Sequence, residues 1–241
     1  MEKNIVNEFF DEVFCINLDR RNDRWLEMDK KFRKLNIFAT RISGTDKLIP
    51  DVKKDYSLLL KEKPNTTIKT AGAYAILLTY LKLFKFILNN TKLNKVLIFE
   101  DDVLFNKNFN NEFKFQSQAL PDDWGMWLLS SSQIGGTELE YTPGKIFYHP
   151  NRTYGLFTFA INRNYLPIAI SILEKRLSPA DTEIISYRDS NNKSYVYVST
   201  KKLTQHDYGY SDNLDRDFTK EFVMNSKDKW RHRIINESEF E

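Results

Sequence analysis

Three adjacent carboxylates follow a short apolar run near the middle of the chain. Residues 96–99 are all apolar, and Glu100, Asp101 and Asp102 come directly after them. Because an unpaired carboxylate is costly to bury, these acids either mark the point where a strand reaches water or hold a cation. Alternation along a strand would send Glu100 and Asp102 to one side and Asp101 to the other. Such a pair of acids suits Mg²⁺ or Mn²⁺, which bind oxygen ligands and keep positions open for phosphate groups.

A group of cations follows the first apolar run, residues 13–17. Arg20, Arg21 and Arg24 come shortly after Asn17, which ends the run. Arginines at this position could bind a diphosphate or fix the loop through bidentate ion pairs, and a solvated helix start would explain them equally well. Helical spacing would place Arg20 and Arg24 on one face and turn Arg21 away. Asn17 could contact a nucleotide base or close the turn.

The elements expected around these residues alternate between strands and helices. Apolar runs predict strands at residues 13–17, 38–42 and 96–99, and apolar spacing predicts helices at 22–35 and 70–88, with a charged loop before the second helix. Further strands are expected at 125–130, 156–161 and 195–199, and a helix at 164–175. This order predicts an α/β fold with a Rossmann-like, mostly parallel central sheet flanked by helices. Because parallel strands bind ligands beyond their carboxyl ends, the arginines and the acids should face one crevice.

Length and composition fit one domain. The 241 residues are 41% hydrophobic and 29% charged, which is enough apolar material for a full core, and no Gly/Ser-rich linker interrupts them. We expect a single domain over residues 1–241, with residues 212–241 as a peripheral C-terminal helix or tail. The net charge is only +3, so the chain lacks the strong basic field that recruits nucleic acid.

Targeting signals are missing from the sequence as given. The first residues contain no apolar segment long enough for a secretory signal. The longest apolar region, residues 71–88, is interrupted by Lys82 and Lys85, which is typical of an amphipathic helix and not of a membrane span. The single cysteine, Cys15, excludes an intrachain disulfide. These features predict a cytoplasmic protein without a transmembrane segment.

Two stretches together resemble the motifs of glycosyltransferase family 25, the lipooligosaccharide and procollagen galactosyltransferase group. VFCINLDRRNDRW is similar to the family's N-terminal motif, and VLIFEDDVLF is similar to its second motif, a strand that ends in Glu-Asp-Asp. Weaker similarity extends to FATRISGTD, TYGLFTFAINR, SPAD and QHDYGYSDN. The segment KTAGAYAILL keeps Gly72 but lacks the acid, the cysteine and the histidine that the family commonly has there, so the resemblance does not specify the acceptor.

The resemblance implies a GT-A fold and an inverting transfer of a hexose, galactose or glucose, from a nucleotide sugar with UDP as the expected nucleotide. It also implies a divalent metal, Mn²⁺ or Mg²⁺, and an acceptor hydroxyl on a glycan, a lipid-linked sugar or a protein. The residues that it assigns to the metal are Asp102 as the principal ligand, Glu100 and His206. The residues expected to bind the donor are Asn17, Leu18, Arg20 and Arg24 of the first motif, together with Glu100 and Asp101, to which the resemblance gives this role.

The catalytic base implied by the resemblance is Asp181, within SPAD. An ordinary helix N-cap is the alternative role for Asp181, because aspartate is among the preferred capping residues. Asp207 and Asp212 are further candidates for the base. For His206, the alternative to a metal ligand is a solvated histidine in a loop.

Two other functions also fit the residues. The acids could belong to another metal-dependent enzyme that processes phosphate groups, which would turn over nucleoside triphosphates or phosphoesters. The fold could also be kept by a non-catalytic glycan-binding or nucleotide-binding protein, which would bind the donor without transferring or hydrolysing its sugar.

Overall fold

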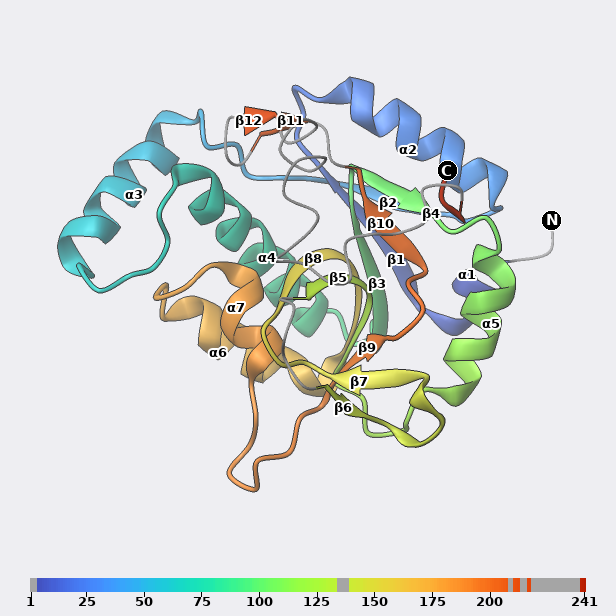
Figure 1. Ribbon diagram of the computed structural model, residues 1–241. Coiled ribbons are helices and arrows are strands. Elements are labelled where there is room, and N and C mark those ends of the chain that lie inside the picture. The colour runs from blue at the N-terminus through green and yellow to red at the C-terminus, as the bar shows by residue number, and fades with distance from the viewer. Residues whose placement is uncertain (1–3, 134–138, 208–209, 213–215, 218–238) are drawn as a thin grey trace.

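A computed structural model describes residues 4–133, 139–207, 210–212, 216–217 and 239–241. Its centre is an eight-stranded sheet with the strand order β2-β1-β3-β8-β5-β9-β7-β6 (Figure 1). The strands of this sheet are β1 (Glu12–Asn17), β2 (Thr40–Ser43), β3 (Lys95–Glu100), β5 (Met126–Gln133), β6 (Glu140–Tyr141), β7 (Phe147–His149), β8 (Thr153–Asn162) and β9 (Val196–Ser199). Six of these strands run in one direction, and only β7 and β8 run against them. The predicted α/β fold with a mostly parallel central sheet is therefore confirmed.

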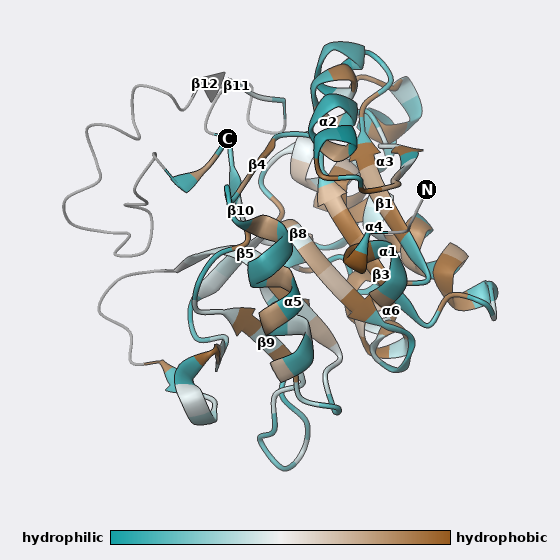
Figure 2. Cartoon of the chain, turned by 90° about the vertical axis from the view of Figure 1, so that its right-hand side faces the viewer, coloured by the Kyte–Doolittle hydropathy of each residue, from teal (hydrophilic) through white to brown (hydrophobic). Residues whose placement is uncertain are grey.

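Helices cover both faces of the sheet. In chain order they are α1 (Ile5–Phe9), α2 (Asn22–Lys34), α3 (Pro50–Glu62), α4 (Ala71–Asn89), α5 (Phe109–Ala119), α6 (Leu166–Glu174) and α7 (Ala180–Ser186). The side chains of α4, α6 and α7 build one core cluster with the sheet, and those of α1, α2 and α5 build a second. Figure 2 shows the hydrophobic strands enclosed between helices with more hydrophilic outer sides.

Strand β3 explains why residues 96–99 are all apolar. Val96 and Ile98 belong to one core cluster, while Leu97 and Phe99 belong to the other. A strand that is buried on both faces has no hydrophilic side, so its sequence does not alternate. The strand pairs with β1 in parallel, and Ile16 lies opposite Glu100. The carboxyl ends of the two strands therefore meet at one edge of the sheet, as the sequence predicted.

Helix α4 is the one described helix that is long and apolar enough to cross a membrane. It has 19 residues, and 56% of its most apolar stretch is buried inside the protein. Its side chains, Tyr74, Leu77 and Phe84 among them, pack into the first core cluster. Thr70 caps the helix by accepting a hydrogen bond from the backbone N–H of Ala73 at 3.0 Å. These contacts are those of a core helix.

Two expectations about the elements are corrected by the structure. The charged segment before residue 67 contains α3, because Pro50 starts a helix whose Val52, Tyr56 and Leu59 form an apolar stripe against the core. The sequence also predicted no helix at residues 109–119, where α5 lies. Most of the expected C-terminal helix or tail, residues 212–241, lies outside the described residues.

Two separate two-stranded sheets stand apart from the central sheet, and one of them lies beside the tip of β3. Strand β4 (Val103–Phe105) pairs antiparallel with β10 (Thr204–His206), and β11 (Tyr210–Ser211) pairs with β12 (Arg216–Asp217). The backbones of Phe105 and Glu241 exchange hydrogen bonds of 2.8 and 2.9 Å. The β4–β10 pair brings His206 opposite Val103, one residue after the acidic run.

Candidate active site

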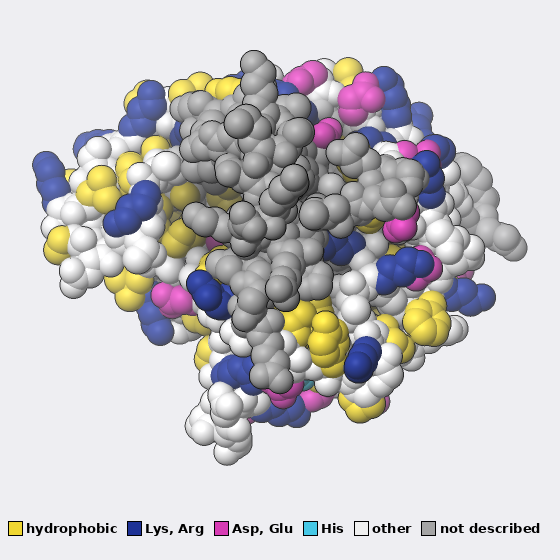
Figure 3. All heavy atoms as spheres, in the orientation of Figure 1, with side chains coloured by type: hydrophobic (Ala, Val, Ile, Leu, Met, Phe, Trp, Pro, Cys, Tyr) yellow, Lys and Arg dark blue, Asp and Glu magenta, His cyan; other side chains and the backbone are white. Residues whose placement is uncertain are grey.

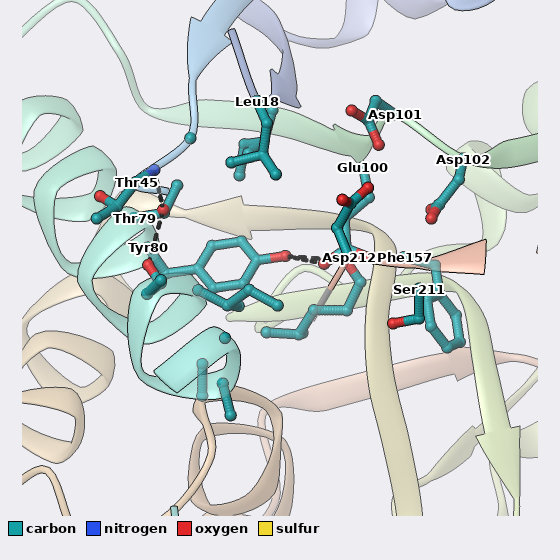
Figure 4. Close-up of a pocket in the computed structure, with 18 of the residues that line it drawn as sticks. Leu18, Thr45, Thr79, Tyr80, Glu100, Asp101, Asp102, Phe157, Ser211 and Asp212 are labelled. Atoms are coloured by element: carbon teal, nitrogen blue, oxygen red, sulfur yellow. Dashed lines mark hydrogen bonds between the residues drawn. The ribbon is translucent and has the colours of Figure 1, made fainter. Parts of the chain in front are cut away.

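A cavity of about 380 Å³ opens at the carboxyl ends of β1 and β3 (Figure 4). Segments that are far apart in the sequence line it: the loop after β1, the start of α4, the tip of β3, strand β8, the start of α7 and strand β10. Its acidic lining residues are Glu100, Asp101, Asp102, Asp181 and Asp212, and its basic ones are Arg20, Arg24 and Lys47. Leu18 and His206 also line it. Most residues predicted to act in the site are thus brought together here.

The acidic run does not alternate as expected from a strand. The chain bends at Asp101 and Asp102, directly after β3 ends at Glu100. As a result Asp101 and Asp102 both accept from Arg24 Nη1, at 3.1 and 2.8 Å, while Glu100 turns to another partner. The expectation that Asp101 points away from Asp102 is wrong, because strand geometry stops one residue earlier than the sequence suggested.

Glu100 is partly buried and contacts a tyrosine of α4. The hydroxyl of Tyr80 donates to Glu100 Oε1 at 2.8 Å and also lies 3.2 Å from the carbonyl oxygen of Leu156. Burial and the charge of Asp102 raise the pKa of Glu100. Burial, followed by the charges of Glu100 and Asp181, raises the pKa of Tyr80 well above its usual range. Tyr80 therefore stands within electrostatic reach of both acid positions, and Figure 4 shows it extending from α4 toward Glu100.

Asp102 has one oxygen in an ion-pair network and one without a hydrogen bond. Its Oδ2 contacts Arg24 at 2.8 Å and His206 Nε2 at 3.4 Å. Burial alone would raise the pKa of Asp102, but His206 and Arg24 outweigh it and hold the pKa below the usual value. Within the described part of the chain, its buried Oδ1 has no hydrogen-bond partner. A buried carboxylate oxygen without a hydrogen bond lowers the stability of the fold unless a further cation or hydrogen-bond donor reaches it.

The donor set fits a divalent metal only if the substrate completes it. No group of three or more His, Cys, Asp or Glu side chains is arranged to hold a metal within the described ranges. The open oxygen of Asp102 and the neighbouring Glu100 could supply hard oxygen ligands of the kind that Mg²⁺ and Mn²⁺ take together with substrate phosphates. His206 is held by Asp102, whose charge raises the pKa of its imidazole although burial opposes this.

The arginines after β1 are all held by acids. Arg24, in the first turn of α2, bridges Asp101 and Asp102. Arg20 pairs with Asp46 and Asp212, each at 2.7 Å. Arg21 also pairs with Asp212, so it does not turn away from Arg20 as helical spacing predicted.

Arg20 and Arg21 can share Asp212 because α2 begins only at Asn22. The two arginines before it stand on irregular backbone, where helical spacing does not apply.

Asn17 and Leu18 occupy different places in the site. Asn17 is 1% exposed, and its amide donates to Asp101 Oδ2 at 2.6 Å and to the carbonyl of Arg21 at 2.9 Å. Its Oδ1 accepts from Arg41 Nε at 2.8 Å. Asn17 therefore stands behind the cavity wall and ties the arginine loop to the acids, while Leu18 lines the cavity itself.

Asp181 is not the N-cap of α7. Pro179 precedes the helix, and the carboxylate of Asp181 instead accepts from the backbone N–H of Gly155 in β8 at 2.8 Å. Burial raises the pKa of Asp181. Gly155 has φ +90°, and a Cβ there would lie 2.5 Å from the ring of Phe157. The positive φ therefore favours a glycine at the position that brings this N–H to the carboxylate.

Of the two other candidate bases, Asp212 has its carboxylate held by Arg20 and Arg21. Asp207 is not among the described residues that line the cavity, and its backbone N–H donates to the carbonyl of Asp102 at 2.6 Å.

Several lining residues had no signal in the sequence. Tyr80 looked like one more apolar position of a long helix, and Gly155 like a strand residue. Lys47 lay in a segment expected to be an irregular loop. Their roles depend on contacts between segments that are far apart in the chain.

Comparison with known proteins identifies the class. The model of glycosyltransferase family 25, described as an LPS biosynthesis protein, matches residues 10–232, and the chain belongs to this family. It is accordingly a glycosyltransferase, an enzyme that transfers a sugar from a donor to an acceptor. No curated protein sequence matches the chain.

Among solved structures, the chain is similar to 4-diphosphocytidyl-2C-methyl-D-erythritolsynthase from Anaerococcus prevotii. The identity is 12% and the TM-score 0.37, over 90% of this chain and 96% of that one.

Proposed function

We propose that this enzyme transfers a hexose, galactose or glucose, from a UDP-sugar to a hydroxyl acceptor with inversion at the sugar carbon. The observation that supports this most is the pair of separate acid positions on one cavity: the Glu100–Asp102 cluster at the tip of β3, and Asp181 at the start of α7. An inverting transferase needs one such position near the leaving diphosphate and another that takes the acceptor's proton.

Asp102 and Glu100 are proposed to hold a divalent cation, Mn²⁺ or Mg²⁺. His206 is proposed as a third ligand, although these three side chains are not already arranged as a metal site in the described structure. The orphaned Oδ1 of Asp102 is the observation in favour of this. When bound, such a cation offsets the negative charge that develops on the leaving diphosphate. Asp101 is proposed to position the donor through its contacts with Asn17 and Arg24.

Arg20 and Arg24 are proposed to bind the donor's diphosphate. Both line the cavity, and guanidinium groups match phosphate oxygens in pairs. Asp212 and the acids at the tip of β3 at present accept from the same guanidinium N–H groups that a phosphate would use. Leu18 supplies an apolar contact from the same loop.

Asp181 is proposed as the general base. Its carboxylate is oriented by the N–H of Gly155 at 2.8 Å, and burial raises its pKa toward the range where a carboxylate accepts a proton more readily. The acceptor is proposed to be a hydroxyl of a lipid-linked glycan, in keeping with the family's description as an LPS biosynthesis protein.

A panel of UDP-sugars with Mn²⁺ tests the proposal, with UDP release as the readout. The variant Asp102→Asn keeps the size of the side chain and removes its charge. We expect a loss of about 10²-fold or more, since a group that stabilises charge in the transition state is worth this much. Asp29→Asn, on the outer side of α2, is the matched control and should stay close to the parent enzyme. An Asp102→Asn enzyme that releases UDP at the parent rate would refute the assignment of the site.

A further inference from the structure

The outward side of α3 carries basic and apolar side chains that the active site does not use. Val52, Tyr56 and Leu59 turn toward the core. The side chains on the other side are exposed, and two of them, Leu58 and Leu60, are large apolar residues at 43% and 44% exposure. We call this surface the outer face of α3; its members are Lys53, Lys54, Ser57, Leu58, Leu60 and Lys61.

The charges of this helix are segregated. Lys53, Lys54 and Lys61 all belong to the outer face, and none of them pairs with an acid among the described residues. The acids of the helix recur at four- and seven-residue spacing, which gathers them on a separate stripe of Asp51, Asp55 and Glu62. The charged side chains of the outer face are therefore all lysines, with a leucine at each side of them, and the exposed Asp51 and Glu62 of the acid stripe border the face.

This surface adjoins the active site through the chain that precedes α3. Lys47 lines the cavity, and the next two residues, Leu48 and Ile49, are 52% and 45% exposed. Figure 1 shows α3 standing out from the sheet beyond the start of α4. In Figure 3, hydrophobic and basic side chains lie intermixed on that side of the molecule. An apolar and basic surface thus begins at the rim of the cavity.

We propose that the outer face of α3, together with Leu48 and Ile49, docks on a lipid bilayer that carries anionic headgroups. Exposed leucines can enter the boundary between headgroups and acyl chains, while lysine stems lie along it and bring their ammonium groups to phosphates. A nucleic acid would match the lysines but leave the leucines in water. The inference rests on the proposed function in one respect, because a lipid-linked acceptor would be presented at such a surface.

Co-sedimentation with vesicles tests this surface on the full chain. The parent should sediment with vesicles of phosphatidylglycerol and phosphatidylcholine at low salt, less so at high salt, and not with phosphatidylcholine alone. The variant K53Q/K54Q/K61Q should bind about a hundredfold more weakly, at roughly fivefold for each lysine near an anionic surface. The matched control K92Q/K107Q/K114Q removes the same charge from elements away from α3, and it should bind like the parent.

Activity and oligomeric state complete the test. UDP release from the donor in solution should be equal in the parent, the α3 variant and the control, so failure of the vesicle test is distinct from failure of the proposed function. The proposal is overturned if the parent ignores anionic vesicles, or if the α3 variant and the control bind equally well. It is also overturned if the parent is a dimer without vesicles and Leu58→Ser/Leu60→Ser converts it to a monomer, since the outer face of α3 would then join two copies of the chain.

Discussion

Arg24 is expected to stabilise the fold by neutralising two carboxylates at once. Its Nη1 lies 3.1 Å from Asp101 and 2.8 Å from Asp102, and the three side chains are only 16%, 11% and 14% exposed. Arg24→Met keeps most of the apolar stem and removes the charge. Breaking a buried ion pair by removing one partner costs about 3–5 kcal/mol, because the remaining charge stays buried.

The lower end of that range applies here. Asp102 keeps its contact with His206, and Asp101 keeps the amide of Asn17. A loss of about 3 kcal/mol corresponds to a melting temperature lower by roughly 6–12 °C for a chain of this size. The deficit should be largest at neutral pH and should shrink as the pH falls, since protonated carboxylates no longer need the arginine.

Thermal and urea unfolding of the metal-free protein measure this effect. Arg33→Met is the matched control: Arg33 pairs with Asp29 at 2.9 Å on the outer side of the same helix, and its side chain is 78% exposed. That exposed pair is worth less than about 0.5 kcal/mol. If the two variants unfold within the same degree or two, Arg24 does not compensate a buried acid pair, and the account of the acid cluster fails.

Three further predictions concern the other parts of the cavity. Asp181→Asn should lower sugar transfer by about 10²–10⁴-fold with donor binding unchanged. Because burial raises the pKa of Asp181, kcat/KM of the parent should fall as the pH drops through that raised pKa, and the variant should not show this fall. Gly155→Ala should destabilise the protein more than Gly144→Ala. Both glycines have positive φ, but only at Gly155 would a Cβ meet a ring at 2.5 Å, and this contact should add about 1–3 kcal/mol to the loss of stability. Equal melting temperatures of the two variants would contradict the clash. Tyr80→Phe should destabilise the protein by about 1–3 kcal/mol in chemical unfolding, since Glu100 loses its 2.8 Å donor, whereas an unchanged midpoint would mean that Glu100 is satisfied in another way.

The sequence predicted the frame of the site because its signals are local. Residues 96–99 form an uninterrupted apolar run, since β3 is buried on both faces, and this run ends at the acids. The order of strands and helices then implied that β1 and β3 are parallel and end at one edge of the sheet. In the structure they are neighbours, which places Glu100 beside Ile16. Leu18, Arg20, Arg24, Asp181 and His206 were likewise expected near the acids, and they line the same cavity.

The contacts inside the site could not be predicted, because they join distant segments. Nothing local in the sequence links Tyr80 to Glu100, or Gly155 to Asp181. The bend at Asp101 likewise follows from the tertiary contacts of the acids and not from their spacing. Helix α3 was missed for another reason: its stripe of three core-facing residues is diluted by charged neighbours, so composition hid the period.

The balance of charge around the cavity has a consequence for the order in which ligands enter. Five acidic side chains line it against three basic ones, and the arginines among the latter are already engaged. At a pH high enough to ionise all five acids, a nucleotide sugar, itself an anion, would meet net repulsion there. Under the proposed function, the small cation should therefore enter first and offset this excess of negative charge, so that the ligands add in a compulsory order.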